Sequence, residues 1–126
     1  MNFKISKKEF LDALNLSNRA ISSTTPLPSL SGIKITVTPD SLILVSSDSN
    51  ISIRTSLTNN EENILTINEE GEIVIDAKYI LEIVRKIDSD FVLVETIDGT
   101  LIKISGGNSE FKINGMNSNE YPQINF

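Results

Sequence analysis

Apolar and polar residues alternate along most of the chain, which is the pattern of strands with one buried face. This alternation predicts strands over residues 3–5, 30–38, 42–46, 51–57, 72–75, 91–97, 101–105 and 110–114. Turn-forming pairs such as Pro39-Asp40 and Asp98-Gly99 separate several of them. Residues 58–71 are acidic, and we interpret them as an exposed connection that can contain a strand near the apolar stretch 64–67.

Two segments change to the 3.6-residue spacing of amphipathic helices. The first follows Ser6, which together with Glu9 has the form of a capping box, and it should run for about four turns. The second should be capped by Asp76 and end at about Ile87. The sequence therefore predicts two helices, each placed after one strand and before three more.

The order strand, helix and three strands is thus written twice, in halves of about 1–62 and 63–126. One hairpin also recurs about sixty residues apart, and its matched residues are Leu42, Ile43, Val45 and Ser46 with Leu101, Ile102, Ile104 and Ser105. We expect an α+β fold in a single domain, 1–126. Each half should form a half-sheet covered by one helix, and the halves should pack about a pseudo-twofold axis.

Composition excludes several classes of protein. The chain has 126 residues, enough for one domain with a core, and contains neither cysteine nor histidine. It therefore has no disulfide framework, no thiolate metal site and no imidazole base. It also lacks an apolar run long enough for a membrane helix. Because residues 1–10 contain no long apolar segment, we expect no secretory signal. A cytoplasmic location, no membrane contact and no cofactor are the expectations.

The positive charge is unevenly distributed. Net charge is −6, which by itself argues against a nucleic-acid partner. However, the two helical segments hold six of the eleven basic residues: Lys7, Lys8, Arg19, Lys78, Arg85 and Lys86. One interpretation is solvated helix faces with ordinary pairs such as Lys8–Asp12. The other is that the helices lie side by side and present a mildly basic surface to a polyanion, through phosphate contacts that carry no sequence information.

No group of residues forms a convincing catalytic or metal site. Asp88 and Asp90 could pair as metal ligands, but they stand between a helix and a strand, where Asp is a common turn residue. The hydroxyls of residues 47–50 have no base to activate them. We therefore expect a protein that is not an enzyme. On the last strand, Phe111 and Ile113 are either core residues or part of an edge that pairs with another protein.

Motifs spread over the whole chain resemble a known family. They are FKI at 3–5, TPLP at 25–28, Leu30, GI at 32–33, SD at 47–48, ISI at 51–53, IDAK at 75–78, FKING at 111–115 and EYP at 120–122. In this order and spacing they resemble the first domain of the bacterial DNA polymerase III beta subunit, the sliding clamp.

This resemblance implies the DNA-clamp fold: two strand–helix–three-strand halves with helices lining a hole and sheets outside. Three such domains per subunit, and two subunits joined head-to-tail, would encircle duplex DNA and keep the replicative polymerase on it. The chain would then end where the first domain stops. Polymerase and clamp loader would bind through the other domains.

The resemblance also implies site residues. The positions expected to face DNA are Lys8, Arg19, Thr24, Lys78 and Arg85, although Thr24 stands where many relatives have an arginine. The positions expected at the subunit interface are Tyr79, Ile83, Ile87, Phe111 and Ile113. The alternative interpretation is a β-rich protein-interaction module with no role on DNA.

Overall fold

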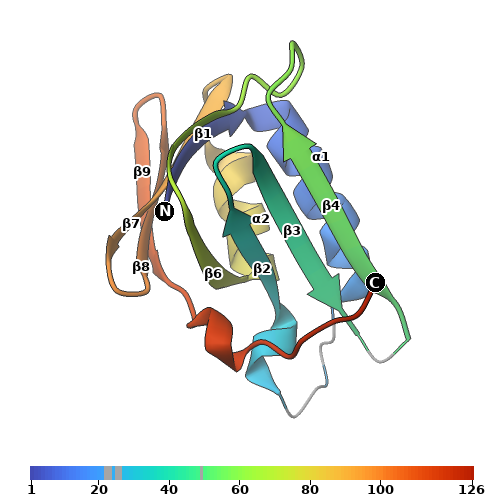
Figure 1. Cartoon of the computed structure of the whole chain (residues 1–126). Coiled ribbons are helices and arrows are strands. Elements are labelled where there is room, and N and C mark those ends of the chain that lie inside the picture. Colours follow the sequence, from blue (N-terminus) through green and yellow to red (C-terminus); the bar gives the residue numbers. More distant parts are fainter. Residues whose placement is uncertain (22–23, 25–26, 49) are drawn as a thin grey trace.

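The computed structural model describes residues 1–21, 24, 27–48 and 50–126, in which two antiparallel sheets share one layer of helices (Figure 1). The first half contributes β1 (Asn2–Ser6), α1 (Lys7–Ser17), β2 (Gly32–Val37), β3 (Ser41–Ser47) and β4 (Ser52–Thr58). After β5 (Thr66–Glu69), the second half contributes β6 (Gly71–Asp76), α2 (Ala77–Lys86), β7 (Phe91–Asp98), β8 (Leu101–Gly106) and β9 (Ser109–Asn114). Short 3-10 turns occupy Asn18–Ala20, Pro28–Ser31 and Ser118–Glu120.

The halves exchange their first strands. Sheet A has the order β5-β1-β7-β8-β9, and sheet B has the order β4-β3-β2-β6. Strand β1 therefore pairs with β7 of the second half, and β6 pairs with β2 of the first. The predicted α+β architecture of two helices on antiparallel sheets is confirmed, but the prediction that each half forms its own half-sheet was wrong. Alternation reveals which face of a strand is buried, whereas it does not encode the neighbouring strand.

The matched hairpin was also aligned one residue out of step. Ile35 faces Leu44 across β2 and β3, and Val94 faces Ile104 across β7 and β8. The structural equivalent of Leu44 is thus Ile104, 60 positions on, and that of Leu42 is Ile102. The pairing of β7 with β8 shifts between Thr96 and Asp98, so the connection from β7 to β8 is one residue longer than the connection from β2 to β3. A one-residue slip exchanges the two faces of a strand, so matching Leu42 with Leu101 set a core residue against one on the outer face.

The two helix starts are capped differently. Asp76 accepts a hydrogen bond from the backbone N–H of Tyr79 at 3.2 Å, which confirms its predicted role as N-cap. Ser6 stands at the N-cap of α1, but its side chain makes no capping hydrogen bond. Its backbone N–H donates instead to the carbonyl oxygen of Asn63 at 2.9 Å. The expected capping box with Glu9 is therefore wrong, because a distant loop supplies that acceptor.

The core lies between the inner faces of the sheets and the helices. Phe3 of β1 and Phe10 of α1 are fully buried, and their rings meet edge to face with centroids 5.8 Å apart. In β2 the predicted face of Ile33, Ile35 and Val37 is buried. The strand begins at Gly32 rather than at residue 30, because Pro28–Ser31 forms a 3-10 turn.

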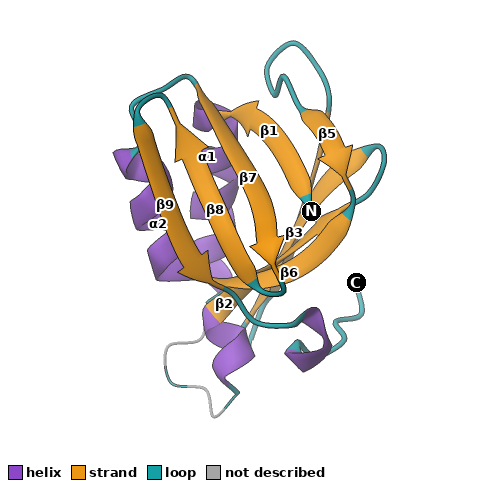
Figure 2. Cartoon of the chain, turned by 90° about the vertical axis from the view of Figure 1, so that its left-hand side faces the viewer, coloured by secondary structure: helices purple, strands orange, loops and turns teal. Residues whose placement is uncertain are grey.

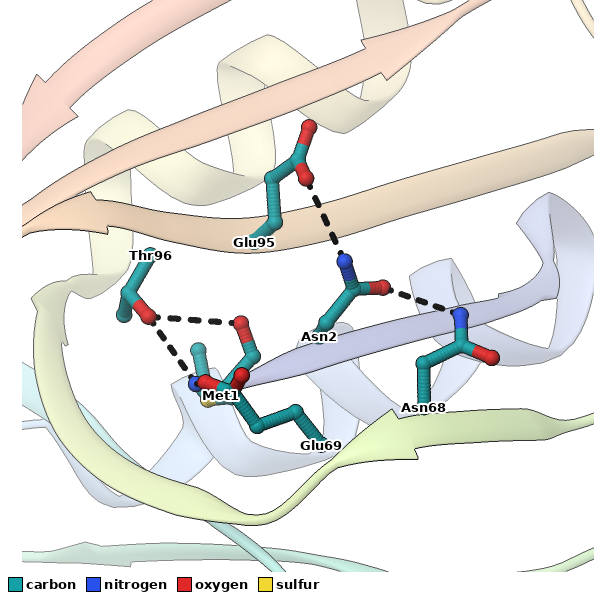
Figure 3. A network of polar contacts seen from close by, with 6 residues as sticks. All are labelled: Met1, Asn2, Asn68, Glu69, Glu95 and Thr96. Atoms are coloured by element: carbon teal, nitrogen blue, oxygen red, sulfur yellow. Dashed lines mark hydrogen bonds and ion pairs between the residues drawn. The ribbon is translucent and has the colours of Figure 1, made fainter.

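The N-terminus is tied to both neighbours of β1 (Figure 3). The ammonium of Met1 donates to Glu69 Oε1 at 2.7 Å and to Thr96 Oγ1 at 2.9 Å. One residue on, the amide of Asn2 donates to Glu95 at 3.2 Å. These contacts join the start of the chain to β5 on one side and β7 on the other.

The C-terminal tail crosses the outer face of sheet B (Figure 1). Tyr121, 7% exposed, packs there with Val45 and Val74 in a small second apolar cluster. Burial raises the pKa of Tyr121 to about 12.

Candidate functional site

The two helices lie side by side, as one of the two interpretations of the charge pattern required. The Lys7 ammonium, at the start of α1, donates to the carbonyl oxygens of Arg85 and Ile87 at the end of α2. The Arg85 guanidinium in turn donates to Asn15 Oδ1 on α1 at 3.3 Å. The Lys7 contacts bring the start of α1 to the end of α2, and the long Arg85 side chain reaches the last turn of α1.

Lys7 thus has a structural role that sequence reasoning missed. The last carbonyl groups of a helix lack partners within the helix and carry partial negative charge. Lys7 supplies both hydrogen bonds and a positive charge to that end of α2. A lysine directly after the Ser6 cap gives no sign of this contact, because its partners are about 80 residues away.

The residues expected to face DNA are all exposed, and they differ in how far their charges are balanced. The side chain of Lys8 is 80% exposed, and its ammonium lies 3.5 Å from Asp12 and 3.6 Å from Glu9. The charges of Asp12 and then Glu9 raise the pKa of Lys8. Lys78 forms no ion pair with any described residue. The surface thus combines one screened lysine with one unpaired lysine.

Arg19 and Thr24 lie beyond α1. Arg19 is exposed within the Asn18–Ala20 turn, and Thr24 is exposed in a bend. Residues 22–23 and 25–26, which include part of the TPLP motif, lie outside the described residues. Arg19 and Lys78 therefore stand toward the end of one helical segment and the start of the other.

A second candidate surface is the groove between α2 and the last strand. Its volume is about 320 Å³, and it is lined by Tyr79, Glu82, Ile83, Lys86, Phe111, Lys112 and Ile113. The apolar members Ile83, Phe111 and Ile113 are half-buried and pack on the core beneath, while Tyr79 is 55% exposed. Among the described strands β9 pairs only with β8, so its other edge has free backbone donors and acceptors. Four of the five residues expected at a subunit interface thus meet in one place.

Ile87 does not join them. Its side chain is 0% exposed and belongs to the core, so the prediction of Ile87 as an interface residue was wrong. It directly follows α2, where its backbone turns to an extended conformation and directs the chain toward β7. Lys86 and Lys112, which were not predicted, line the groove instead. Helical spacing from Ile83 to Lys86 is the signal that could have placed Lys86.

The carboxylates and hydroxyls considered above as catalytic or metal-binding groups form hydrogen bonds within turns. Asp48 accepts from the backbone N–H groups of Ile51 at 2.8 Å and Asn50 at 2.6 Å, and these hydrogen bonds lower its pKa. Ser89, between Asp88 and Asp90, accepts from the N–H of Phe91 at 3.2 Å. Across the described part of the chain, no three acidic side chains gather in a way that could hold a metal ion. Nor does any described helix have the length and apolar character to span a membrane.

Two antiparallel sheets, a pair of adjacent helices and a free edge strand are the arrangement expected for the DNA-clamp class. The chain belongs to the family described as DNA polymerase III beta subunit, N-terminal domain, which matches residues 1–125. This confirms the resemblance seen in the motifs.

Named relatives and solved structures agree with this family assignment. The chain is 36% identical to the beta sliding clamp of Bacillus subtilis and 33% identical to that of Mycoplasma capricolum, over 98% and 100% of its length. Its fold matches the DNA polymerase III beta chain of Streptococcus pneumoniae with a TM-score of 0.95, at 34% identity over 99% of the chain. It matches the Bacillus subtilis sliding clamp with a TM-score of 0.94, at 34% identity over all of the chain. The chain spans about a third of each relative's length.

Proposed function

We propose that this chain is one segment of a ring-shaped sliding clamp that encircles duplex DNA and confers processivity on a replicative polymerase. The exposed sides of α1 and α2 face the DNA, and the groove between α2 and β9 receives the next subunit head-to-tail. The segment is a non-catalytic, cytoplasmic accessory part. Polymerase and clamp loader bind through regions that correspond to the other two thirds of the relatives.

The observation that carries this proposal is the contact between the helices. Because Lys7, Asn15 and Arg85 bind across them, α1 and α2 form one continuous surface rather than two scattered faces. The unpaired charge of Lys78 and the guanidinium of Arg85 can reach phosphates without base readout. The low net charge of this surface favours weak contact with DNA, which suits a protein that slides along it.

The groove supports the head-to-tail arrangement. It offers apolar side chains, a free strand edge and two lysines on its rim, Lys86 and Lys112. A partner strand can pair with β9 while its apolar side chains cover Phe111 and Ile113. Replacing both by serine should abolish docking of the neighbouring subunit, and sedimentation of a ring containing this segment measures it.

DNA titration of the 126-residue chain tests the helix surface. In low salt, a duplex of arbitrary sequence should shift the backbone NMR signals around Lys8, Lys78 and Arg85. The shifts should disappear as salt rises, because phosphate binding releases counterions. The double variant Lys78→Glu/Arg85→Glu should lose them. The double variant Lys4→Glu/Lys112→Glu changes the net charge equally on the outer face of sheet A and should keep them.

The alternative, a protein-interaction module without a role on DNA, has one observation in its favour. The charge of Lys8 is balanced by Asp12 and Glu9, as expected for a solvated helix face. That alternative predicts equal, minimal shifts in both charge-reversal variants. Tight, sequence-selective binding would reject both interpretations.

A further inference from the structure

On the outer face of each sheet, one row of three paired residues occupies the same place in its half of the fold. Both helices follow their N-cap residue directly, so Ser6 corresponds to Asp76 and Lys4 to Val74. The strand registers then extend the correspondence across each sheet. On sheet B the row is Val74, Lys34 and Val45, and on sheet A it is Lys4, Leu93 and Ser105.

On sheet B this position is filled by an aromatic side chain of the chain itself. Tyr121 packs on Val45 and Val74, and the Lys34 ammonium lies 5.6 Å from the centre of its ring. Glu72 lies on the same face of sheet B, where the hydrogen bond from Thr36 at 2.6 Å lowers its pKa most and the charge of Lys34 contributes least. Lys34 therefore has an aromatic ring beside it and a carboxylate on the same face.

The equivalent position on sheet A is a hollow. It has a volume of about 360 Å³ and is lined by Lys4, Phe91, Leu93, Ser105 and the Gly106–Gly107 turn. Figure 2 shows this face of sheet A toward the viewer, with the helices behind it and the C-terminal tail turned away toward sheet B. No described segment lies across it. Half-buried Phe91 and Leu93 thus line a hollow at the position that Tyr121 covers on the other sheet.

The charge at this hollow is also incomplete. The Lys4 ammonium lies 4.7 Å from the centre of the Phe91 ring. No described carboxylate forms an ion pair with it, and the residue equivalent to Glu72 is the uncharged Asn2. Nearby Lys103 is paired with Glu95 at 3.2 Å. The hollow therefore offers apolar contact and one unpaired cation.

We propose that this hollow on sheet A is a docking site for an extended peptide segment of a partner protein, which inserts an aromatic side chain and places a neighbouring carboxylate on Lys4. The aromatic side chain takes the place that Tyr121 takes on sheet B, and the carboxylate supplies the charge partner that Lys4 lacks. The chain's own tail has a suitable order of residues, since Glu120 precedes Tyr121. This site is separate from the helix surface and from the β9 edge, so it does not depend on the proposed clamp function.

The tail itself supplies the probe. We would add an acetylated peptide of residues 117–126, NSNEYPQINF, to the isotope-labelled 126-residue chain and follow its NMR signals. Saturable shifts are expected at Lys4, Leu93 and Ser105. A peptide with the change Tyr121→Ala should bind at least about tenfold more weakly, because it loses the buried ring. A peptide with Glu120→Gln should bind severalfold more weakly.

Variants of the protein locate the site. Lys4→Glu and Leu93→Ser should each abolish peptide binding while leaving the other signals in place. Lys112→Glu, on the outer face of β9, is the matched control and should bind normally. The proposal is overturned if millimolar peptide causes no shift, or if the Tyr121→Ala peptide binds equally well. Shifts confined to Lys34 and Val45 would also overturn it, since they indicate exchange with the chain's own tail.

Discussion

The ammonium nitrogen of Met1 lies 2.7 Å from Oε1 of Glu69, which is 68 residues further along the chain (Figure 3). Met1 is almost fully buried, whereas the Glu69 side chain is 70% exposed. The hydrogen bond from the Met1 ammonium and then its charge lower the pKa of Glu69. This contact connects the start of β1 with β5, the outermost strand of sheet A.

Replacing Glu69 by glutamine should therefore lower stability near neutral pH. A carboxyl whose pKa is depressed in the folded state stabilises it above the unfolded pKa, about 4.5, and loses that effect as pH falls through the folded value. The difference between wild type and Glu69→Gln should thus shrink below about pH 4. Urea unfolding at pH 7 and pH 3.5 measures it. Glu70→Gln, next in the chain, is the control and should behave as wild type at both values.

Two glycines with the same backbone conformation form a matched pair. Gly99 and Gly107 have φ of 58° and 55°, so alanine at either should cost about 1–2 kcal/mol. A Cβ at Gly99 meets nothing within 4 Å, but at Gly107 it would lie 2.7 Å from the backbone oxygen of Asp88. Gly107→Ala should therefore cost about 1–3 kcal/mol more than Gly99→Ala. Equal costs in thermal unfolding would show that the Asp88 loop moves aside freely.

The neighbouring lysines at the start of α1 should differ in their effect on stability. Lys7→Met removes the hydrogen bonds to the end of α2 and should cost about 1 kcal/mol. Lys8→Met removes only exposed ion pairs and should change stability by less than about 0.5 kcal/mol. Urea unfolding of the two variants compares them. A cost that is equal, or larger for Lys8, would contradict the role given to Lys7.

The buried hydroxyl of Tyr121 has no hydrogen-bond partner among the described residues. Tyr121→Phe should therefore leave stability unchanged or raise it by up to about 1 kcal/mol at pH 7. Since the folded pKa is about 12 and the ordinary value is 10, wild type should lose stability between pH 10 and 12, because only the unfolded chain releases that proton there. Tyr121→Phe should not show this part of the loss. Ultraviolet titration of Tyr79→Phe, which retains Tyr121, measures the midpoint directly.

Much of the fold follows from local pattern, and its failures have identifiable causes. The buried face of β2 and the cap at Asp76 depend on nearby residues and were predicted correctly. The exchange of β1 and β6, the Asn63 acceptor at Ser6 and the bulge near Thr96 depend on distant contacts or on a single inserted residue. Helical and strand periodicity contain no information about distant contacts or about single inserted residues.

The candidate surfaces show the same division. The groove between α2 and β9 was anticipated from Phe111 and Ile113 together with the family resemblance, and the structure brings Tyr79 and Ile83 to them. Ile87 was assigned to the interface through the family resemblance alone, whereas its side chain is fully buried in the core. The hollow on sheet A could not be found from the sequence, since it is recognised only through the registers that relate it to Tyr121.

Site-directed crosslinking tests most directly whether the helix surface faces DNA. The chain has no cysteine, so a photoreactive group can be attached to a single introduced one. We would replace the matched third of the Bacillus subtilis clamp by residues 1–126, remove other cysteines, and load the ring on circular duplex DNA. Probes at Lys78→Cys and Arg85→Cys should crosslink to DNA, whereas a probe at Glu110→Cys, exposed on the outer face of β9 and outside the groove, should not. Equal crosslinking at all three positions, or crosslinking only at residue 110, would contradict the inward orientation of the helices.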